Sequence, residues 1–131
     1  MIDSFAARCI GGGAALMLLG VALGAFGAHG LQDLVTPRQL ESYRTGVTYQ
    51  QLHALGLVLL GLVAQATSPT PLLRWSARLV VAGIVFFCGS IYAMTAGAPR
   101  WFGAVAPVGG LSFMAAWALL AWHALVAARR R

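Results

Sequence analysis

The chain has no lysine and only three acidic residues, so it carries little charge for its length. Charged residues make up 9% of the 131 residues, whereas hydrophobic residues make up 60%. A soluble domain needs more polar side chains than this to cover its surface. The composition therefore excludes a soluble domain and predicts an integral membrane protein.

Cysteine is scarce as well, because Cys9 and Cys88 are the only two in the chain. Each lies within an apolar run, and the two positions should sit at different depths in a membrane. Two thiols that are far apart cannot form a disulfide. We therefore expect both cysteines to serve as small apolar packing residues.

Groups that carry out chemistry are missing from the apolar runs. The chain has no phosphate-binding loop, no nucleophile with a base placed to activate it and no paired carboxylates. A small multidrug exporter is similar in size and number of spans, but it needs an intramembrane carboxylate for proton coupling. The sequence therefore disfavours that class and predicts a protein that is not an enzyme. The sequence predicts no cofactor and no metal site.

Four long apolar runs are present, and each approaches the roughly 20 residues that cross a hydrocarbon core about 30 Å thick. They cover residues 5–28, 47–66, 75–96 and 105–128. Backbone in lipid must satisfy its own hydrogen bonds, so each run is expected to be a helix. The prediction is a single all-α transmembrane domain over residues 1–131, a four-helix bundle. The first run could instead be a signal peptide, but its length favours a retained helix.

The first connection carries its own helix-start signal. Thr36 is placed as an N-cap, Pro37 as the first helical residue, and Gln39 completes the spacing of a capping box. We expect a short amphipathic helix in this outer connection. It either lies along the membrane interface or continues into the second span, with Gly46 as the expected hinge.

Arginines are distributed unevenly between the two sides of the membrane. With a cytoplasmic N-terminus, the cytoplasmic side holds the larger group. That group is Arg8, Arg74, Arg78, Arg129, Arg130 and Arg131, and the opposite group is Arg38, Arg44 and Arg100. Both termini of this multi-pass protein are therefore predicted to be cytoplasmic. Arginines at the edges of apolar runs suit lipid headgroups better than nucleic acid.

Small residues indicate how the helices pack, because helices in lipid associate through close backbone contact rather than hydrophobic gain. The first run is rich in glycine and includes a GxxxG spacing, so we expect it to be the central helix. The fourth run has a Pro-x-Gly-Gly stretch, which should either bend the helix or admit a close neighbour. The predicted packing residues are Gly20, Gly24, Gly27, Pro107, Gly109 and Gly110.

Polar residues within the spans gather in the predicted outer leaflet. They are His29, Tyr49, Gln50, His53, Ser90 and Tyr92. Unpaired polar groups are expensive in hydrocarbon, so we expect these side chains to face one another. They would form a structural hydrogen-bond network, line a cavity for a ligand, or bind haem or a metal through the two histidines. The network is favoured over a metal site, because His123 belongs to the opposite leaflet and no third ligand lies nearby.

These stretches also carry a resemblance to a known family. They are GAFGAHGL at residues 24–31, Tyr49-Gln50 with His53-Ala54-Leu55, Gly89-Ser90 with Tyr92, and Pro107 with Gly109-Gly110 and Trp117. Together they resemble the successive signatures of the YgdD/YwdK-like family. That family consists of small bacterial inner-membrane proteins of uncharacterised function, with similar small proteins in eukaryotes. The resemblance covers nearly the whole chain and implies a four-span protein of the bacterial inner (plasma) membrane. It implies no reaction, ligand or catalytic residue.

Three functions remain open at this point. The first is a non-catalytic accessory, assembly or stabilising component that packs against a larger membrane complex or against its own copies. The second is a binder or conduit for a small lipid-like or neutral solute, through a polar cavity in the outer leaflet. The third is a haem or metal protein. The expected partners are membrane lipids and other membrane subunits, and no nucleic acid.

Overall fold

The computed structural model describes residues 1–129, and every regular element within them is a helix. Four helical stretches are long and apolar enough to cross a membrane. The elements are α1 (Ser4–His29), α2 (Pro37–Thr67), α3 (Pro71–Gly83), the π-helix η1 (Ile84–Cys88), α4 (Gly89–Thr95), the 3-10 helix η2 (Arg100–Ala104) and α5 (Ala106–Arg129). The predicted all-α, four-span fold is confirmed. Arg130 and Arg131, which the sequence assigns to the cytoplasmic side, lie outside the described residues.

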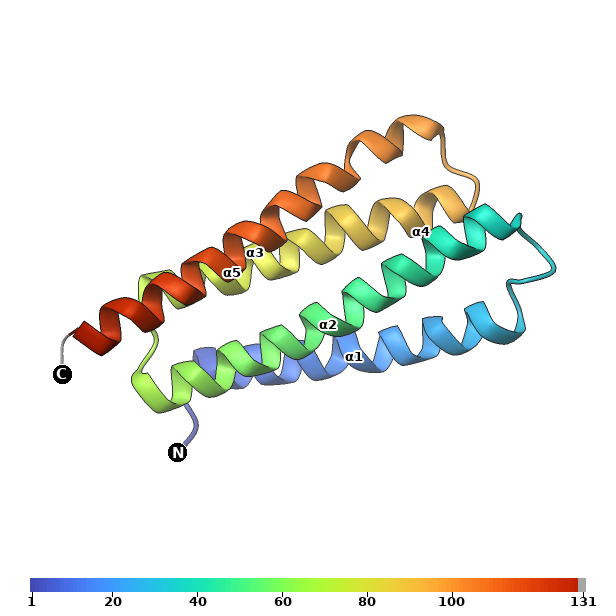
Figure 1. Cartoon of the computed structure of the whole chain (residues 1–131). Coiled ribbons are helices and arrows are strands. Elements are labelled where there is room, and N and C mark those ends of the chain that lie inside the picture. The colour runs from blue at the N-terminus through green and yellow to red at the C-terminus, as the bar shows by residue number, and fades with distance from the viewer. Residues whose placement is uncertain (130–131) are drawn as a thin grey trace.

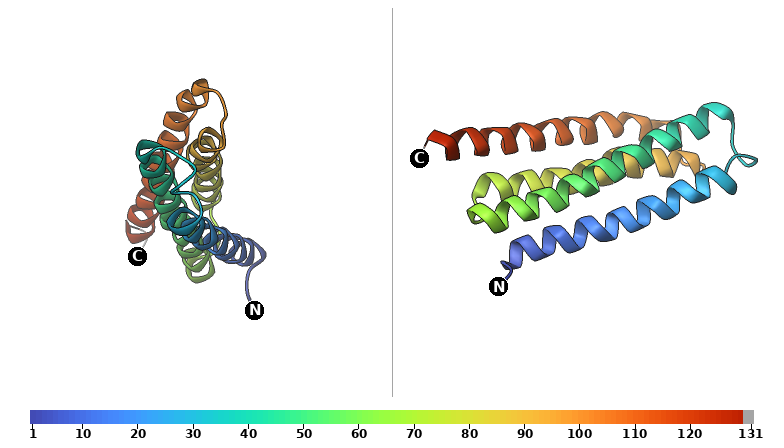
Figure 2. Two further views of the ribbon diagram at one scale, coloured as in Figure 1. Left: turned by 90° about the vertical axis from the view of Figure 1, so that its right-hand side faces the viewer. Right: turned by 60° about the horizontal axis from the view of Figure 1, so that its bottom comes forward.

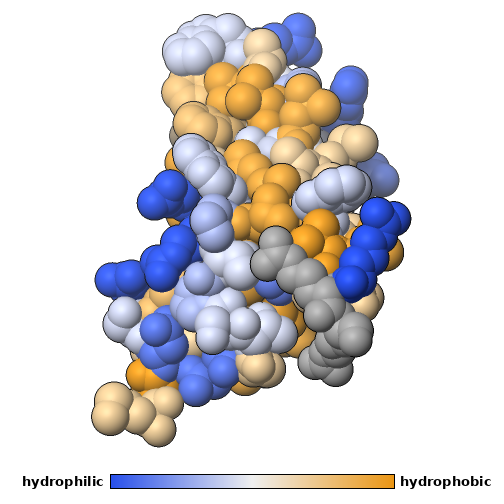
Figure 3. All heavy atoms as spheres, turned by 90° about the vertical axis from the view of Figure 1, so that its left-hand side faces the viewer, coloured by the Kyte–Doolittle hydropathy of each residue, from blue (hydrophilic) through white to orange (hydrophobic). Residues whose placement is uncertain are grey.

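Successive spans run antiparallel, so the connections alternate between the two ends of the bundle (Figure 1). The start of α1, the α2–α3 connection and the end of α5 meet at one end, which we call the terminal end. The other two connections form the loop end. α1 and α5 lie at opposite edges of the bundle, with α2 and α3 between them (Figure 2). Figure 3 looks at the terminal end and shows hydrophilic side chains separated by hydrophobic surface, as expected where helices leave the hydrocarbon.

The capping box predicted at the start of α2 is confirmed. Thr36 Oγ1 accepts a hydrogen bond from Gln39 N at 3.2 Å, and Gln39 Oε1 accepts one from Thr36 N at 2.9 Å. The helix then continues to Thr67, so the short outer helix is the first part of α2 itself. Gly46 is helical and packs near Ile91, so the expected hinge there is wrong.

α2 is the central helix of the bundle, and the expectation that α1 holds this place is wrong. Half of the apolar window of α2 is buried within the chain, against 17% for α1 and for the span that contains α5. Three glycines of α2 approach three different helices: Gly61 faces α1, Gly56 faces Trp117 of α5, and Gly46 faces α4. The close-packed glycines of α1 face α2 alone, so they make α1 the partner of one helix rather than of several.

The contact between α1 and α2, which we call the α1–α2 seam, repeats every seven residues on both helices. One series is Ala6, Gly13, Gly20 and Gly27, and the other is Tyr43, Gln50, Leu57 and Ala64, and all eight residues are buried. A seven-residue repeat is typical of left-handed, coiled-coil-like packing. A Cβ at Gly13 would lie 2.7 Å from Ala54 O, and a Cβ at Gly27 would lie 2.6 Å from the Tyr43 ring. A Cβ at Gly24, by contrast, would lie 3.4 Å from Val47 Cγ1, which is an ordinary contact distance.

α5 packs against α3 and η1 through one glycine of the Pro-x-Gly-Gly stretch. A Cβ at Gly109 would collide with the backbone N of Phe87, whereas a Cβ at Gly110 would meet open space. Pro107 is the second residue of α5, where its missing N–H breaks no helical hydrogen bond. Of the two predicted effects, the structure therefore shows the close approach and not the bend.

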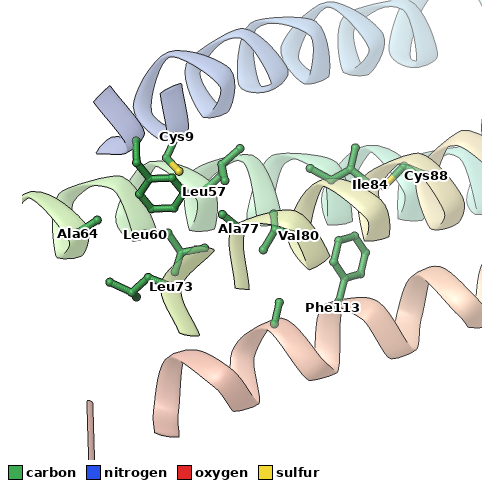
Figure 4. Close-up of a cluster of buried hydrophobic side chains, with 12 residues drawn as sticks. Cys9, Leu57, Leu60, Ala64, Leu73, Ala77, Val80, Ile84, Cys88 and Phe113 are labelled. Carbon is green, nitrogen blue, oxygen red and sulfur yellow. The ribbon is translucent and has the colours of Figure 1, made fainter. Parts of the chain in front are cut away.

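A buried apolar cluster joins all four spans (Figure 4). Cys9 of α1 points toward Leu57 of α2, and Val80 of α3 lies near Phe113 of α5. Cys9 and Cys88 are both buried and unpaired, so the expectation of two packing cysteines without a disulfide is confirmed.

Candidate functional site

The structure divides the six predicted polar residues into separate groups. Gln50 and Tyr92 bind each other, and Tyr49 and His53 belong to an aromatic stack nearby. Ser90 donates to Phe87 O of its own span at 2.9 Å. His29 ends α1 as an exposed residue. The expectation that His29 faces the other polar groups is wrong, because the last turn of α1 directs it away from α2.

Gln50 is the centre of a hydrogen-bond chain that crosses three helices. Its Nε2 donates to Leu16 O of α1 at 2.9 Å, and its Oε1 accepts from the Tyr92 hydroxyl of α4 at 2.7 Å. Gln50 is 1% exposed, so neither group can bind water. We call Gln50, Tyr92 and Leu16 O the Gln50 network. It satisfies an amide that would otherwise be unpaired in hydrocarbon.

The glycines of α1 make the hydrogen bonds from α2 to the α1 backbone possible. In an α-helix, Leu16 O accepts from the N–H of Gly20, and Leu23 O accepts from that of Gly27. Because these two glycines have no side chain, the second lone pair of each carbonyl stays accessible from α2. Gln50 binds the first carbonyl, and the Tyr43 hydroxyl donates to the second at 2.6 Å. Sequence reasoning missed these acceptors, although the equal seven-residue spacing on the two helices signals them.

His53 is 6% exposed and is bound through both of its ring nitrogens. Nδ1 lies 2.7 Å from Tyr49 O, and Nε2 lies 3.1 Å from Trp117 Nε1. A carbonyl can only accept and an indole N–H can only donate, so Nδ1 carries the proton and Nε2 accepts. The ring stacks on Phe113 with centroids 3.5 Å apart. We call His53, Phe113 and Trp117, together with Tyr49, the His53 stack.

This geometry does not suit a metal or haem ligand. A metal needs a ring nitrogen with a free lone pair, and both nitrogens of His53 are already engaged. Across residues 1–129, no three histidine, cysteine or acidic side chains gather where they could hold a metal ion. The site offers hydrogen bonds and aromatic contact between helices, which is the chemistry of helix association.

Two polar contacts lie toward the terminal end, where the sequence suggested none. Ser76 Oγ donates to Ala116 O at 2.8 Å and joins α3 to α5. The Thr70 hydroxyl lies 3.1 Å from His123 Nδ1, whereas His123 Nε2 is buried without a partner within the described residues. The polar groups are therefore spread over the length of the bundle rather than confined to one leaflet.

Comparison with known proteins gives a consistent result. The model of a protein family described as "Protein of unknown function (DUF423)" matches residues 23–110. A UPF0382 membrane protein of Staphylococcus haemolyticus is 38% identical over 108 residues, which cover 82% of this chain and 87% of the relative. The UPF0382 membrane protein YwdK of Bacillus subtilis is 39% identical over 108 residues, covering 82% of this chain and 88% of the relative. No solved structure matches the chain.

Proposed function

Because the chain belongs to the DUF423 family of membrane proteins, whose function is unknown, we propose its role from its own geometry. The protein is a non-catalytic membrane component that packs against another membrane protein, as an accessory, assembly or stabilising subunit. The observation that carries this proposal is the exposed face of α1, which lies at the edge of the bundle and carries a series of small residues at helical spacing.

The outward faces of the two edge helices both carry bulky side chains. The exposed residues of α5 include Leu111, Met114 and Trp122, which are the bulky side chains that suit contact with lipid. The exposed face of α1 carries the large side chains of Leu18, Leu19, Val21 and Phe26, but it also carries small residues at helical spacing. These are Gly11, Ala14, Ala15, Ala22, Ala25 and Ala28. Small residues at helical spacing let the backbone of another helix come close. The small residues at helical spacing on α1 support a further helix partner on that face.

The alternative function, a cavity for a small solute in the outer leaflet, receives less support. It requires polar side chains that point into free space. The Gln50 amide and the His53 ring are instead bound to other groups of the chain on both sides. A solute would have to displace these internal hydrogen bonds before it could bind.

We also propose that the protein lies in the bacterial inner membrane with both termini in the cytoplasm. Arg8, Arg74, Arg78 and Arg129 belong to the terminal end, and Arg38, Arg44 and Arg100 to the loop end. The larger group marks the cytoplasmic side under the positive-inside rule. In the single-cysteine variants Ser68→Cys and Gln32→Cys of a chain lacking Cys9 and Cys88, an impermeant thiol reagent should label only residue 32 in intact cells. Labelling of residue 68 alone would reverse the orientation.

Site-specific photocrosslinking in the native membrane tests the accessory role. A photoreactive amino acid replaces Ala15 on α1 or, as the matched control, Met114 on α5, at the natural level of expression. We expect a single stoichiometric crosslink to another membrane protein from position 15 and none from position 114. The double variant Ala15→Phe/Ala22→Phe should lose that partner in native mass spectrometry and keep its thermal stability.

Three results would count against the proposal. A crosslink from position 15 to a second copy of this chain would make the α1 face a homo-oligomer interface. Equal crosslinking from both positions would indicate random collisions in the membrane. Lipid adducts alone from position 15, with a partner-free protein after mild extraction, would show that the α1 face meets only lipid.

A further inference from the structure

A groove runs between α1 and α3 at the terminal end, with α2 as its floor. It has a volume of about 590 Å³, within the range of ligand sites. Phe5 and Leu16 line it from α1, Leu57 from α2, and Ala77 and Val81 from α3. These side chains make it apolar along its length. We call it the α1–α3 groove.

Three arginines line the same groove, which is unusual for an apolar surface. They are Arg8 of α1 and Arg74 and Arg78 of α3. The Arg74 guanidinium lies 5.0 Å from the centroid of the Phe5 ring, across the groove between the two helices. Arg78 lies 4.9 Å from the centroid of the Trp75 ring. Aromatic rings therefore hold two guanidinium groups at the groove.

No carboxylate of the described chain neutralises these charges at the groove. Asp33 and Glu41 belong to the loop end. The Asp3 carboxylate caps α1 by accepting from Phe5 N at 2.8 Å and Ala6 N at 3.2 Å. The α1–α3 groove thus combines apolar walls with three guanidinium charges, an arrangement that suits an anionic ligand.

The depth of the arginines matches the headgroup region of a bilayer. α1 has 26 residues and is thus about 39 Å long, longer than a hydrocarbon core of about 30 Å. Arg8 and Arg74 lie about 5 Å from the starts of their helices, and Arg78 about 10 Å. Their side chains can reach the phosphate layer while the apolar part of the groove runs into the hydrocarbon.

We propose that the α1–α3 groove binds one anionic phospholipid. Its phosphate pairs with Arg8, Arg74 and Arg78, since guanidinium forms bidentate hydrogen bonds with phosphate. One acyl chain lies along Leu16, Leu57 and Val81. Basic pockets between transmembrane helices are suited to anionic lipid headgroups. This proposal is independent of the partner proposed for the outward face of α1.

A second pocket shows why charge alone is not the basis of the proposal. It lies at the loop end, has a volume of about 520 Å³ and contains Arg38 and Arg100. Its other walls mix apolar residues such as Ile91 and Met94 with Thr36, Gln39 and Ser42, so it is more polar than the α1–α3 groove. It holds the same kind of charge with less apolar wall for an acyl chain, so its arginines provide a matched control.

The charge test uses purified full-length protein in mild detergent, titrated with phosphatidylglycerol and followed by native mass spectrometry. Arg74→Gln/Arg78→Gln and the control Arg38→Gln/Arg100→Gln remove the same net charge. We expect the first variant to retain phosphatidylglycerol roughly thirty-fold less well and the control to match the wild type. Equal losses in both variants would mean general charge attraction and would overturn the site.

The acyl-chain test leaves every charge in place. A Cβ at Gly12 points into the groove beside Leu57 at 3.8 Å, whereas a Cβ at Gly11 meets open space. Gly12→Leu should therefore reduce phosphatidylglycerol retention at least about ten-fold, and Gly11→Leu should not. Thermal unfolding checks that both variants fold. Unchanged retention in Gly12→Leu, equal retention of phosphatidylcholine, or equal binding of glycerophosphoglycerol without acyl chains would overturn the proposal.

Discussion

In the α1–α2 seam the helices meet through glycines that repeat every seven residues, whereas α5 meets α3 and η1 mainly through the Phe113 ring and one close backbone contact at Gly109. Side chains donate to main-chain carbonyls in both pairs. Gly13, Gly20 and Gly27 bring the α2 side chains onto the backbone of α1. On the other side, Phe113 fills the space beside Gly83, and Ser76 donates to Ala116 O. The comparison shows that two helix pairs in one apolar bundle can combine contacts differently. The α1–α2 seam repeats a backbone approach along both helices, whereas α5 meets the α3–η1 segment by ring packing and one close backbone contact at Gly109.

The largest effect should come from the close backbone contact of α5 with η1, the π-helical turn that follows α3. In Gly109→Ala the new Cβ collides with the backbone N of Phe87, which cannot move without displacing η1. We expect the free energy of unfolding in detergent to fall by about 3 kcal/mol, the upper range for overpacking. Gly110→Ala is the matched control and should change it by less than about 0.5 kcal/mol. Similar stability of the two variants would contradict the close approach of α5.

The corresponding glycine of the α1–α2 seam is Gly13. In Gly13→Ala the new Cβ lies 2.7 Å from Ala54 O and 3.0 Å from Val58 N, so α1 must shift along the whole seam. We expect a loss of about 2 kcal/mol in the free energy of unfolding. Gly11→Ala, which meets nothing within 4 Å, should be neutral. If both variants unfold alike, the seven-residue seam does not hold α1 to α2.

The hydrogen bonds of the Gln50 network should contribute less to the free energy of unfolding than the glycines of the seam. Gln50→Leu keeps the approximate volume but removes both hydrogen bonds of the Gln50 network and leaves the Tyr92 hydroxyl unpaired. With about 0.6 kcal/mol for an average intramembrane hydrogen bond, we expect a loss of about 1–2 kcal/mol. A double-mutant cycle with Tyr92→Phe should give a coupling of at least about 0.5 kcal/mol. Purely additive losses would mean that the two residues do not act together.

The smallest effect is expected for the hydrogen bond that Ser76 of α3 makes with α5. Ser76→Ala removes the donor to Ala116 O and should lower the free energy of unfolding by about 0.6 kcal/mol. Ser112 donates only to Val108 O within its own helix, so Ser112→Ala is the control and should be close to neutral. A loss for Ser76→Ala as large as that for Gln50→Leu would remove the contrast between the two helix pairs.

Features that depend on neighbours close in the sequence could be predicted. The four spans follow from apolar runs of membrane length, and the cap at Thr36 follows from a three-residue spacing. The absence of a disulfide between Cys9 and Cys88 follows from their different depths. Each of these properties is set by composition or by a few adjacent residues, so the rest of the fold cannot change it.

Features that depend on the rotation of one helix against another could not be predicted. Gly20, Gly24 and Gly27 were predicted as packing residues and all three face α2, but the close contact at Gly13 was not predicted, because it depends on how α1 is turned against α2. His29 shares a leaflet with His53 and yet points away from it. Depth can be counted along one helix, whereas the direction of a side chain depends on how its helix is turned toward its neighbours.

The π-helical turn η1 has a consequence for how relatives are aligned. Such a turn holds one residue more than the α-helical turn that it replaces, and it separates α3 from α4. A relative that is one residue shorter in this span can keep both helices in place if the missing residue falls within Ile84–Cys88. A deletion elsewhere in the span would rotate the following helix by about 100° and turn Tyr92 away from Gln50. An alignment gap in this span therefore belongs at the π-helical turn.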